Sequence, residues 1–355
     1  MSMKVKIIGA GSIGNHLAQA ARRMNWEVVV VDRDKKALNR MKDEIYPSRY
    51  GAWDPEISLF ESINEPKGDF DVIMVGTPPD VRMRVALEAL KEEPRILQLE
   101  KPIATPFDTS LKKFASRYQK QKKTIALVGY DHAVAESIQY IVTLLQEKVI
   151  GNAVTLDVEF REHWEGIFKA HPWLLGPQDT YLGFWKRGGG ASGEHSHALH
   201  LWQYLARVAG LGEWKYVAPL LKLERRGKAE YDSVASFSIE TQKGAVGRVV
   251  QDVVTKPTRK WIRIQGTAGF IEWICGGHPD GDLVRVSREF NEVKEEVFKK
   301  KRPDDFYREM LHIQDILEGK VKRNKSPISF ESGFSVMKLI DTVWKKNREK
   351  KILLS

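Results

Sequence analysis

Two short stretches of the sequence carry side chains that could move a proton or stabilise a developing charge. Lys101 lies in Glu100-Lys101-Pro102 after an apolar run, where an ammonium group could hydrogen-bond a substrate hydroxyl and stabilise an alkoxide. His197 follows the glycines at 188–190, and a neutral histidine can accept a hydroxyl proton as its carbon loses hydride. Pro102 predicts a cis bond or a tight turn that aims the lysine. The residues alone also permit a solvated Glu-Lys pair and a purely structural histidine.

The stretch around His197 is predicted to begin a helix. Helical spacing places Glu194, His197 and His200 three residues apart, so they fan over one side, whereas His195 points elsewhere. Glutamate and histidine can also bind zinc. This spacing matches no strong zinc pattern and no cysteine lies nearby, so the sequence predicts no metal.

A glycine-rich turn near the N-terminus predicts a dinucleotide site. The apolar residues 5–8 lead into Gly9-x-Gly11-x-x-Gly14, and a helical pattern follows. In that context the first glycine permits the tight turn, the second lets the backbone approach a pyrophosphate, and the third lets the helix pack close to the strand. The N-terminus of the helix attracts phosphate.

An acidic residue completes this fingerprint. The second apolar run ends on Asp32, eighteen residues beyond Gly14, where a carboxylate can accept hydrogen bonds from the adenosine ribose. A carboxylate repels the 2′-phosphate of NADP and so favours NAD. The adjacent Arg33 could bind that phosphate, so NADP is the alternative cofactor. The predicted cofactor-binding residues are Gly9, Gly11, Ser12, Ile13, Gly14, Asp32, Arg33, Thr77, Pro78, Glu100 and Lys101.

The first part of the chain alternates strand and helix patterns, which predicts a doubly wound parallel sheet of the Rossmann type. Polar or turn residues follow several of the predicted strands, at the edge where such sheets bind ligands. The predicted strands after Asp32 are 72–76, 95–99 and 124–128, the helices are 35–44, 58–63, 81–90 and 108–121, and 46–54 is a loop.

The pattern changes in the second part. Closely spaced strand patterns joined by turns predict an antiparallel sheet with helices over one face. The predicted strands are 154–160, 216–223, 233–240, 245–254, 261–265, 270–274 and 283–287; the helices are 136–147, 191–208, 304–318 and 330–347. The interpretation is an α/β Rossmann domain at residues 1–130 and an α+β substrate-binding and oligomerisation domain at 131–355.

An aromatic loop between these elements is the predicted wall of a substrate site. Residues 164–187 combine tryptophans with Lys186 and Arg187, and sugar recognition needs flat apolar surface plus hydrogen-bonding groups. The alternative is a satellite core under a long loop. The predicted substrate-binding residues are Tyr130, Trp164, Trp185, Arg187, Glu194, His197 and His200.

Length and composition limit the function classes. With 355 residues the chain can form two domains with sizeable cores, and 42% hydrophobic with 29% charged residues is ordinary for a globular protein. No apolar run reaches membrane-spanning length, no signal peptide is apparent, and the single Cys275 cannot form an internal disulfide, which together favour the cytoplasm. The net charge of +10 is interpreted as solvated faces, with attraction of an anionic substrate as the alternative; no nucleic-acid-binding module is recognised.

Taken together, these motifs resemble the Gfo/Idh/MocA oxidoreductases, named for glucose–fructose oxidoreductase and inositol dehydrogenase. The matching motifs are the glycine fingerprint, Thr77-Pro78-Pro79, Glu100-Lys101-Pro102, Gly129-Tyr130 and the glycine-rich helix with Ser196-His197. The resemblance implies NAD(P)-dependent oxidation or reduction of sugars, inositols or nucleotide sugars, and a homodimer or homotetramer formed through the second sheet. It also implies that Lys101 and His197 are the catalytic residues.

The chain departs from the family pattern at three places that concern the substrate. Glu194 and His200 stand where the family often has aspartates, Asp131-His132-Ala133-Val134 replaces a segment that often holds a basic residue, and Val81-Arg82 replaces a histidine. Two other functions share these motifs: an NAD-dependent glycosidase with no net redox change, and a non-catalytic sensor. The presence of both Lys101 and His197 disfavours the sensor, which needs no proton acceptor.

Overall fold

The computed structural model describes residues 2–169, 171, 173–301 and 303–353, and the chain forms two compact units. The first contains Met1–Ala104, Asp108–Asp131 and Arg302–Phe330, and the second contains Thr105–Phe107, His132–Lys301 and Glu331–Ser355. A segment near the C-terminus is therefore part of the N-terminal unit. The assignment of residues 1–130 to the cofactor and 131–355 to the substrate stays a prediction.

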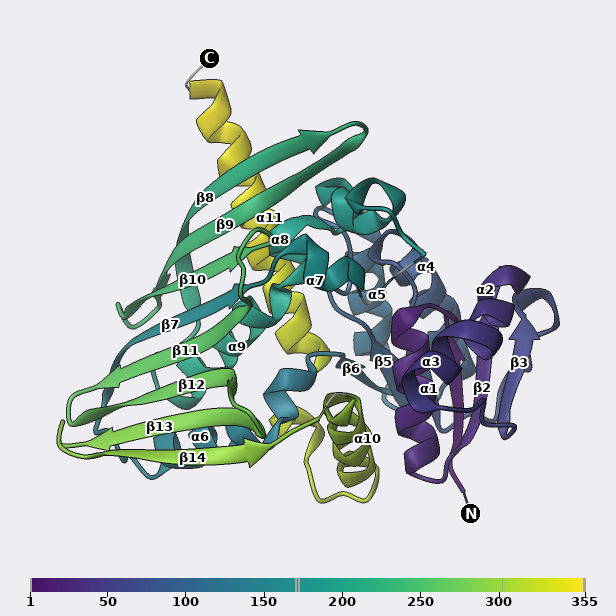
Figure 1. Cartoon of the computed structure of the whole chain (residues 1–355), viewed down its shortest axis with the longest axis horizontal. Helices are drawn as coiled ribbons and strands as arrows, with labels where there is room; N and C mark the ends of the chain where they lie inside the picture. Colours follow the sequence, from purple (N-terminus) through teal and green to yellow (C-terminus); the bar gives the residue numbers. More distant parts are fainter. Residues whose placement is uncertain (1, 170, 172, 302, 354–355) are drawn as a thin grey trace. The chain divides into compact units, whose positions relative to one another are not determined.

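The first unit is built on a parallel sheet, as the alternating pattern predicted. Six strands occur among its described residues, in the order β3-β2-β1-β4-β5-β6 (Figure 1). Both faces of the sheet are covered, so its central strands are continuous apolar runs such as Val28–Val31. The strands are β1 Lys4–Ile8, β2 Glu27–Asp32, β3 Ile57–Glu61, β4 Val72–Val75, β5 Ile96–Leu99 and β6 Ile125–Val128.

Helices connect these strands and cover the sheet. They are α1 Ser12–Arg23, α2 Lys35–Arg40, α3 Tyr46–Tyr50, α4 Pro79–Ala89 and α5 Thr109–Lys120, with α10 Asp304–Leu317 added from the late segment. The carboxylate of Asp108 caps α5 by accepting from the Ser110 N–H at 2.7 Å. The helix α10 packs on α1, where Arg23 forms an ion pair with Asp304 at 3.0 Å.

Two local predictions in this unit are wrong. The predicted helix at 58–63 is the edge strand β3, because backbone pairing with β2 stabilises an extended segment there. The predicted loop at 46–54 contains α3, which follows a single π-helical turn at Met41–Ile45. Tyr46 is buried, Arg49 donates to the Ser12 hydroxyl of α1 at 2.8 Å, and the Tyr50 hydroxyl lies 2.5 Å from Nδ1 of His16, so tertiary packing stabilises a helix that local turn residues disfavour.

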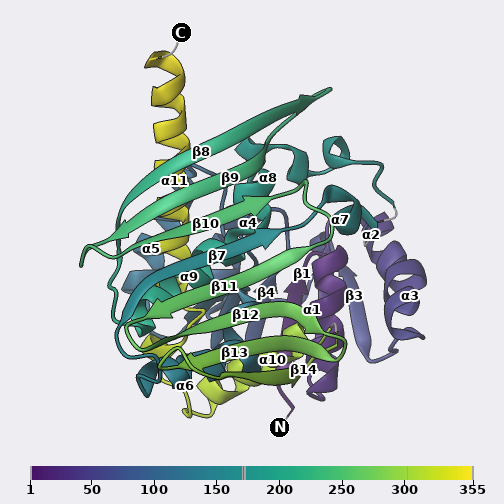
Figure 2. The same ribbon diagram turned by 60° about the vertical axis from the view of Figure 1, so that its left-hand side comes forward.

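The second unit is built on a large, mostly antiparallel sheet, also as predicted (Figure 2). Within the described residues its eight strands have the order β14-β13-β12-β11-β7-β10-β9-β8, and only β7 and β10 pair in parallel. The edge strand β14 was not predicted because its segment is highly charged and lacks an apolar face. The strands are β7 Ala153–Arg161, β8 Trp214–Arg226, β9 Ala229–Thr241, β10 Val246–Asp252, β11 Arg259–Gly266, β12 Gly269–His278, β13 Gly281–Arg288 and β14 Val293–Lys299.

Helices pack against one face of this sheet (Figures 1 and 2). Leu156, Val158 and Phe160 point to that face and are at most 1% exposed, and Trp202 donates its indole N–H to the Leu156 carbonyl at 2.9 Å. The helices of this unit are α6 Glu136–Gln146, α7 Trp164–Lys169, α8 Gly190–Glu194, α9 Ser196–Val208 and α11 Phe330–Leu353. Across both units, no helix in the described chain combines the length and apolarity that crossing a bilayer requires.

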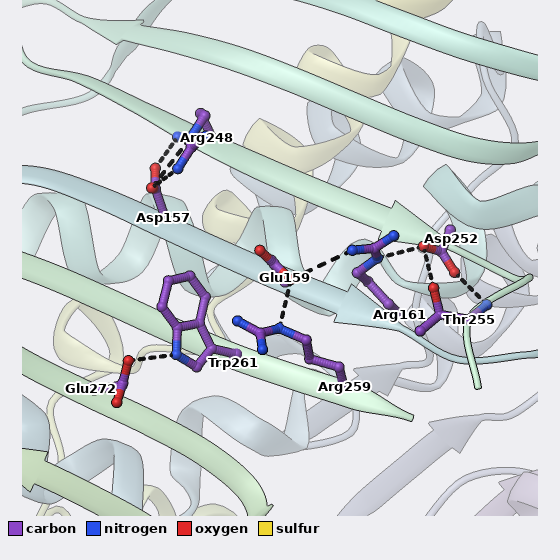
Figure 3. Close-up of polar contacts among 9 residues, drawn as sticks. All are labelled: Asp157, Glu159, Arg161, Arg248, Asp252, Thr255, Arg259, Trp261 and Glu272. Atoms are coloured by element: carbon purple, nitrogen blue, oxygen red, sulfur yellow. Dashed lines mark hydrogen bonds and ion pairs between the residues drawn. The ribbon is translucent and has the colours of Figure 1, made fainter. Parts of the chain in front are cut away.

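The opposite face of the sheet carries a network of cross-strand ion pairs (Figure 3). The alternate residues of β7 lie here: Asp157 pairs with Arg248 at 2.5 Å, Glu159 with Arg259 at 2.8 Å, and Arg161 with Asp252 at 2.6 Å. Alternation of side chains along each strand therefore gives the sheet one apolar and one charged face.

Candidate active site

The glycine turn has the geometry that the fingerprint predicts. Gly9 adopts a φ of +115°, and a Cβ at Gly14 would lie 1.9 Å from the Gly9 carbonyl oxygen, so the tight turn and the close helix packing both require glycine. Gly11 is exposed, and a Cβ there would meet no described atom within 4 Å. This open side, next to the N-terminus of α1, fits the pyrophosphate of a dinucleotide.

The carboxylate of Asp32 borders the same turn. Its Oδ2 accepts from the Ala10 N–H at 2.8 Å, and its Oδ1 accepts from the Asp34 N–H at 2.9 Å. Each carboxylate oxygen can accept a second hydrogen bond, so the group retains capacity for two ribose hydroxyls. Arg33 is exposed beside it. The residues present therefore fit the adenosine end of NAD.

A buried arginine joins the two loops that carry Thr77 and Lys101. Arg82 on α4 is 2% exposed; its guanidinium donates to the Glu100 carbonyl at 2.8 Å and also to the carbonyls of Pro102 and Thr77. The Lys101–Pro102 peptide is cis, which confirms one of the two geometries predicted there. In the sequence Arg82 is only a departure from the family pattern, because no local signal shows which carbonyls a side chain reaches.

The carboxyl of Glu100 lies in the interior of the first unit. It is 4% exposed, and a Cβ at Gly129 would lie 2.5 Å from its Oε1, which explains the glycine of the Gly129-Tyr130 pair. Burial raises the pKa of Glu100, and the charges of Arg82 and Lys101 oppose that rise. The predicted cofactor contact of Glu100 stays a prediction, but the structure gives its carboxyl a packing role.

A second buried carboxyl lies near it. Glu309 on α10 is fully buried and accepts from the side-chain amide of Gln98 at 3.2 Å. Burial raises the pKa of Glu309 well above its ordinary value, and the nearby charge of Glu100 raises it further. Two buried carboxyls close to one another cannot both ionise cheaply, which is why the charge of Glu100 adds to the rise in the pKa of Glu309.

In the second unit, the predicted helix at 191–208 is broken. The helix α8 ends at Glu194 and α9 begins at Ser196, so Glu194 does not share a helix with His197 and His200, and the predicted three-residue fan is wrong. The buried Gln251 of β10 donates its side-chain amide to the His195 carbonyl at the break. A long-range contact thus interrupts a locally helical pattern.

His197 lies against a residue that sequence analysis did not select. The ring of His132, in the 3-10 turn Asp131–Val134, stacks on that of His197 with centroids 4.8 Å apart and planes at 22°. His200 is 1% exposed and contacts the Ser332 hydroxyl at 3.2 Å.

The glycines before α8 approach the protein's own backbone and side chains. A Cβ at Gly193 would lie 2.1 Å from the Gly188 carbonyl oxygen, and one at Gly190 would lie 1.9 Å from Oδ1 of Asp232 on β9. Oδ2 of Asp232 accepts from the Ser192 N–H at 2.7 Å. This buried carboxyl therefore anchors the turn that leads to His197.

We expect Asp232 to make stability depend on pH. Burial raises its pKa to about 7 although hydrogen bonds from Ser192 lower it. Between pH 3.8, the ordinary pKa of the group, and pH 7 the folded chain keeps a proton that the unfolded chain has lost. The contribution of Asp232 to the free energy of unfolding of the wild-type protein is therefore highest at low pH and falls as the pH rises towards 7. Asp232→Asn should gain stability relative to wild type between pH 4 and 8, by about 4 kcal/mol at most.

Thermal unfolding followed by circular dichroism at several pH values checks this expectation. The matched control is Asp280→Asn, which removes a carboxylate from the exposed turn between β12 and β13. A constant difference between Asp232→Asn and wild type across this pH range would show that Asp232 is already ionised in the folded protein.

The aromatic loop is more ordered and more buried than predicted. It contains α7 and several 3-10 turns. Trp185 is 6% exposed and stacks on Trp344 of α11 at 4.1 Å, and Trp164 is equally buried beside Tyr231. The guanidinium of Arg187 lies over the ring of Phe184 at 5.7 Å. These contacts show that much of the loop is a satellite core, while its role in substrate binding stays a prediction.

A comparison with family models matches residues 3–130 to the oxidoreductase family with an NAD-binding Rossmann fold, GFO_IDH_MocA. These residues belong to the Gfo/Idh/MocA family. The resemblance inferred from the motifs is thereby confirmed, and the first unit contains an NAD-binding Rossmann domain. The comparison with curated proteins gives no match.

Solved structures share the fold over the whole chain. A levoglucosan dehydrogenase in complex with NADH and levoglucosan is 20% identical, with 99% of this chain and 98% of that chain covered at a TM-score of 0.75. The WlbA dehydrogenase from Bordetella pertussis, in complex with NADH and UDP-GlcNAcA, is 18% identical with the same coverage and a TM-score of 0.70. A UDP-N-acetylglucosamine 3-dehydrogenase from Acidithiobacillus ferrooxidans is 15% identical over 97% of each chain, with a TM-score of 0.69. At these identities the likeness establishes the fold.

The predicted site residues are divided between the two units of the chain. In the first, the structure brings Asp32 to the glycine turn and joins the Thr77 and Lys101 loops through Arg82; Pro78 is exposed and Tyr130 is buried. In the second, it places His197 against His132 and separates Glu194 from α9. Arg82 and His132 are the residues that the sequence motifs did not identify.

Proposed function

We propose that this chain is an NAD-dependent oxidoreductase that acts on a hydroxyl-bearing carbon of a sugar, an inositol or a nucleotide sugar. The observation that carries the proposal is the glycine turn with Asp32 beside it, whose open side at Gly11 fits a dinucleotide. Lys101, on a loop held by a buried guanidinium, supplies a group suited to alcohol chemistry.

Two side chains have distinct roles in the proposed reaction. His197 accepts the hydroxyl proton of the substrate through its imidazole, and stacking on His132 restrains the ring. Lys101 donates a hydrogen bond to the same oxygen and stabilises the negative charge that develops on it. NAD, which the glycine turn and Asp32 would hold, would supply the acceptor for the hydride that leaves the carbon. Arg82 keeps the Lys101 backbone in place and takes no part in proton transfer.

NAD is the proposed cofactor in preference to NADP. The Asp32 carboxylate at the ribose end of the turn would repel a 2′-phosphate. The levoglucosan and WlbA dehydrogenases that share the fold were solved with NADH. Arg33 is exposed nearby, so a direct comparison of the two reduced cofactors is the appropriate test.

A sugar-type substrate is proposed because the motifs resemble the Gfo/Idh/MocA family and because two solved structures with this fold contain such ligands, one levoglucosan and the other UDP-GlcNAcA. The net charge of +10 suits an anionic member of that class. The proposed substrate contacts remain Tyr130, Trp164, Trp185, Arg187, Glu194, His197 and His200, together with His132. No resident metal is proposed.

The chain is further proposed to form a homodimer or homotetramer in the cytoplasm. The proposed surface for the subunit contact is the face of the large sheet opposite its helices, which carries the cross-strand ion pairs of Figure 3. A single monomeric species in sedimentation velocity at micromolar concentration would contradict this part of the proposal.

A direct experiment tests the function. The protein should quench or shift its intrinsic fluorescence on titration with NADH, more tightly than with NADPH, and should accumulate NADH when incubated with NAD and the correct member of a panel of sugars, inositols and nucleotide sugars. Sugar release at a constant NAD concentration would favour the glycosidase instead. Failure to bind either reduced cofactor would overturn the proposal.

A further inference from the structure

The segment between α2 and β3 brings a cationic side chain to the glycine turn. Arg49 on α3 donates from Nη1 to the Ser12 carbonyl at 3.0 Å and from Nη2 to the Ser12 hydroxyl at 2.8 Å. Ser12 is the first residue of α1 and directly follows Gly11, whose Cβ position is open. The guanidinium therefore lies at the N-terminus of α1, beside the open side of the turn.

Neighbouring rings hold Arg49 in this position. Its Nη1 lies 3.2 Å from Nε2 of His16, and Nδ1 of His16 lies 2.5 Å from the Tyr50 hydroxyl. Arginine can only donate, so Nε2 of His16 accepts from Arg49 in this contact. The His16 ring also stacks on Phe306 of α10 at 4.6 Å with planes 6° apart. Residues from α1, α3 and α10 thus fix one guanidinium.

The charges around the glycine turn show why a cationic side chain is needed there. The Asp32 carboxylate is hydrogen-bonded to Ala10 in the same turn, so a pyrophosphate there would meet a negative charge on its ribose side. The α1 N-terminus contributes only about half a positive charge through its backbone dipoles. The first turn of α1, residues 12–15, contains no lysine or arginine of its own, and Arg49 supplies the full charge.

We propose that Arg49 is a cofactor-binding residue that contacts the pyrophosphate of the dinucleotide beside Ser12. This inference rests on the proposed cofactor binding. The full positive charge of the guanidinium attracts a phosphate group, and hydrogen bonds from Nη1 and Nη2 to Ser12 fix that charge in place before any ligand arrives. The residue lies seventeen positions after Asp32, outside the glycine fingerprint, in a segment whose pattern predicts a loop.

The test compares binding of three ligands that differ in their phosphates. Titration of NADH, ADP-ribose and adenosine should show Arg49→Gln weakening NADH and ADP-ribose about 10- to 100-fold, the range for loss of a charge-assisted contact. Adenosine, which lacks phosphate, should bind equally well to both proteins. Arg49→Lys should lose less affinity for NADH and ADP-ribose than Arg49→Gln, because lysine keeps the positive charge although it lacks the planar guanidinium group. The affinity of the glutamine variant should also depend less on salt.

Lys42→Gln is the matched control, because it removes an exposed positive charge from the turn before α3 and should leave NADH binding unchanged. Equal NADH affinity in Arg49→Gln and wild type would overturn the inference while leaving the function intact. An equal loss for adenosine would show a structural role only, and a loss confined to NADPH would assign Arg49 to the 2′-phosphate; either contradicts the inference. Absence of dinucleotide binding by wild type would overturn both proposals.

Discussion

Replacing Lys101 with methionine is expected to lower kcat about 100- to 1,000-fold, the usual cost of removing one donor that stabilises a developing oxyanion. The dissociation constant for NADH should change by less than about threefold, because the Lys101 loop is held through the backbone carbonyls of Glu100 and Pro102 by Arg82. Methionine retains the length of the side chain and loses only the ammonium group. Steady-state kinetics on the substrate identified by the panel, together with NADH titration, measure both quantities.

Lys91→Met is the matched control for Lys101→Met. It removes an exposed lysine that pairs with Glu88 on the surface, and it should leave kcat and the dissociation constant for NADH unchanged. Turnover of Lys101→Met near the wild-type rate would exclude a role for the ammonium in the reaction. A rise in KM with kcat unchanged would assign Lys101 to substrate binding only.

Substitution of Gly14 by alanine is expected to have the largest effect on the first unit. The new Cβ would lie 1.9 Å from the Gly9 carbonyl oxygen, a backbone atom, so α1 would have to move away from the turn. Overpacking of this kind costs about 3 kcal/mol or more, which corresponds to a fall in Tm of roughly 6 °C or more for a domain of this size. NADH binding should be lost with the displaced helix.

Gly11→Ala is the matched variant, since its Cβ would meet no described atom within 4 Å. The Tm should therefore stay near that of wild type, while the added methyl group obstructs the pyrophosphate and weakens NADH binding about tenfold or more. Thermal unfolding and NADH titration of both variants separate folding from binding. If Gly11→Ala bound NADH as tightly as wild type, the dinucleotide would not lie against this turn.

The local pattern of the sequence was sufficient for most of the elements and for the cofactor fingerprint. Apolar runs that end in glycine or polar residues predicted β1, β2, β4, β5 and β6, and closely spaced alternating segments predicted the second sheet. The roles of Gly9, Gly11 and Gly14 followed from the same short stretch; the structure confirms the tight turn at Gly9 and the close helix packing at Gly14, and the pyrophosphate contact at Gly11 stays a prediction. These features depend on residues within a few positions of one another, which is the range that periodicity reports.

Tertiary contacts decided the features that the pattern missed. β3 is a strand because it pairs with β2, and α3 is held to α1 by contacts of Arg49 with Ser12 and of Tyr50 with His16. The break between α8 and α9 is held by Gln251, which is more than fifty residues away in the chain. Each depends on a partner that local periodicity cannot identify.

Within the candidate site, too, some features follow from the local sequence and others only from tertiary contacts. The sequence by itself determined which residue types stand at the strand ends and in the glycine turn, including Asp32 and Lys101. Only the folded chain showed that Arg82 joins two loops, that Arg49 reaches Ser12, and that a segment near the C-terminus packs on the N-terminal unit. The physical reason is that a hydrogen bond or a buried contact is set by distance in space, whereas a sequence pattern records only distance along the chain.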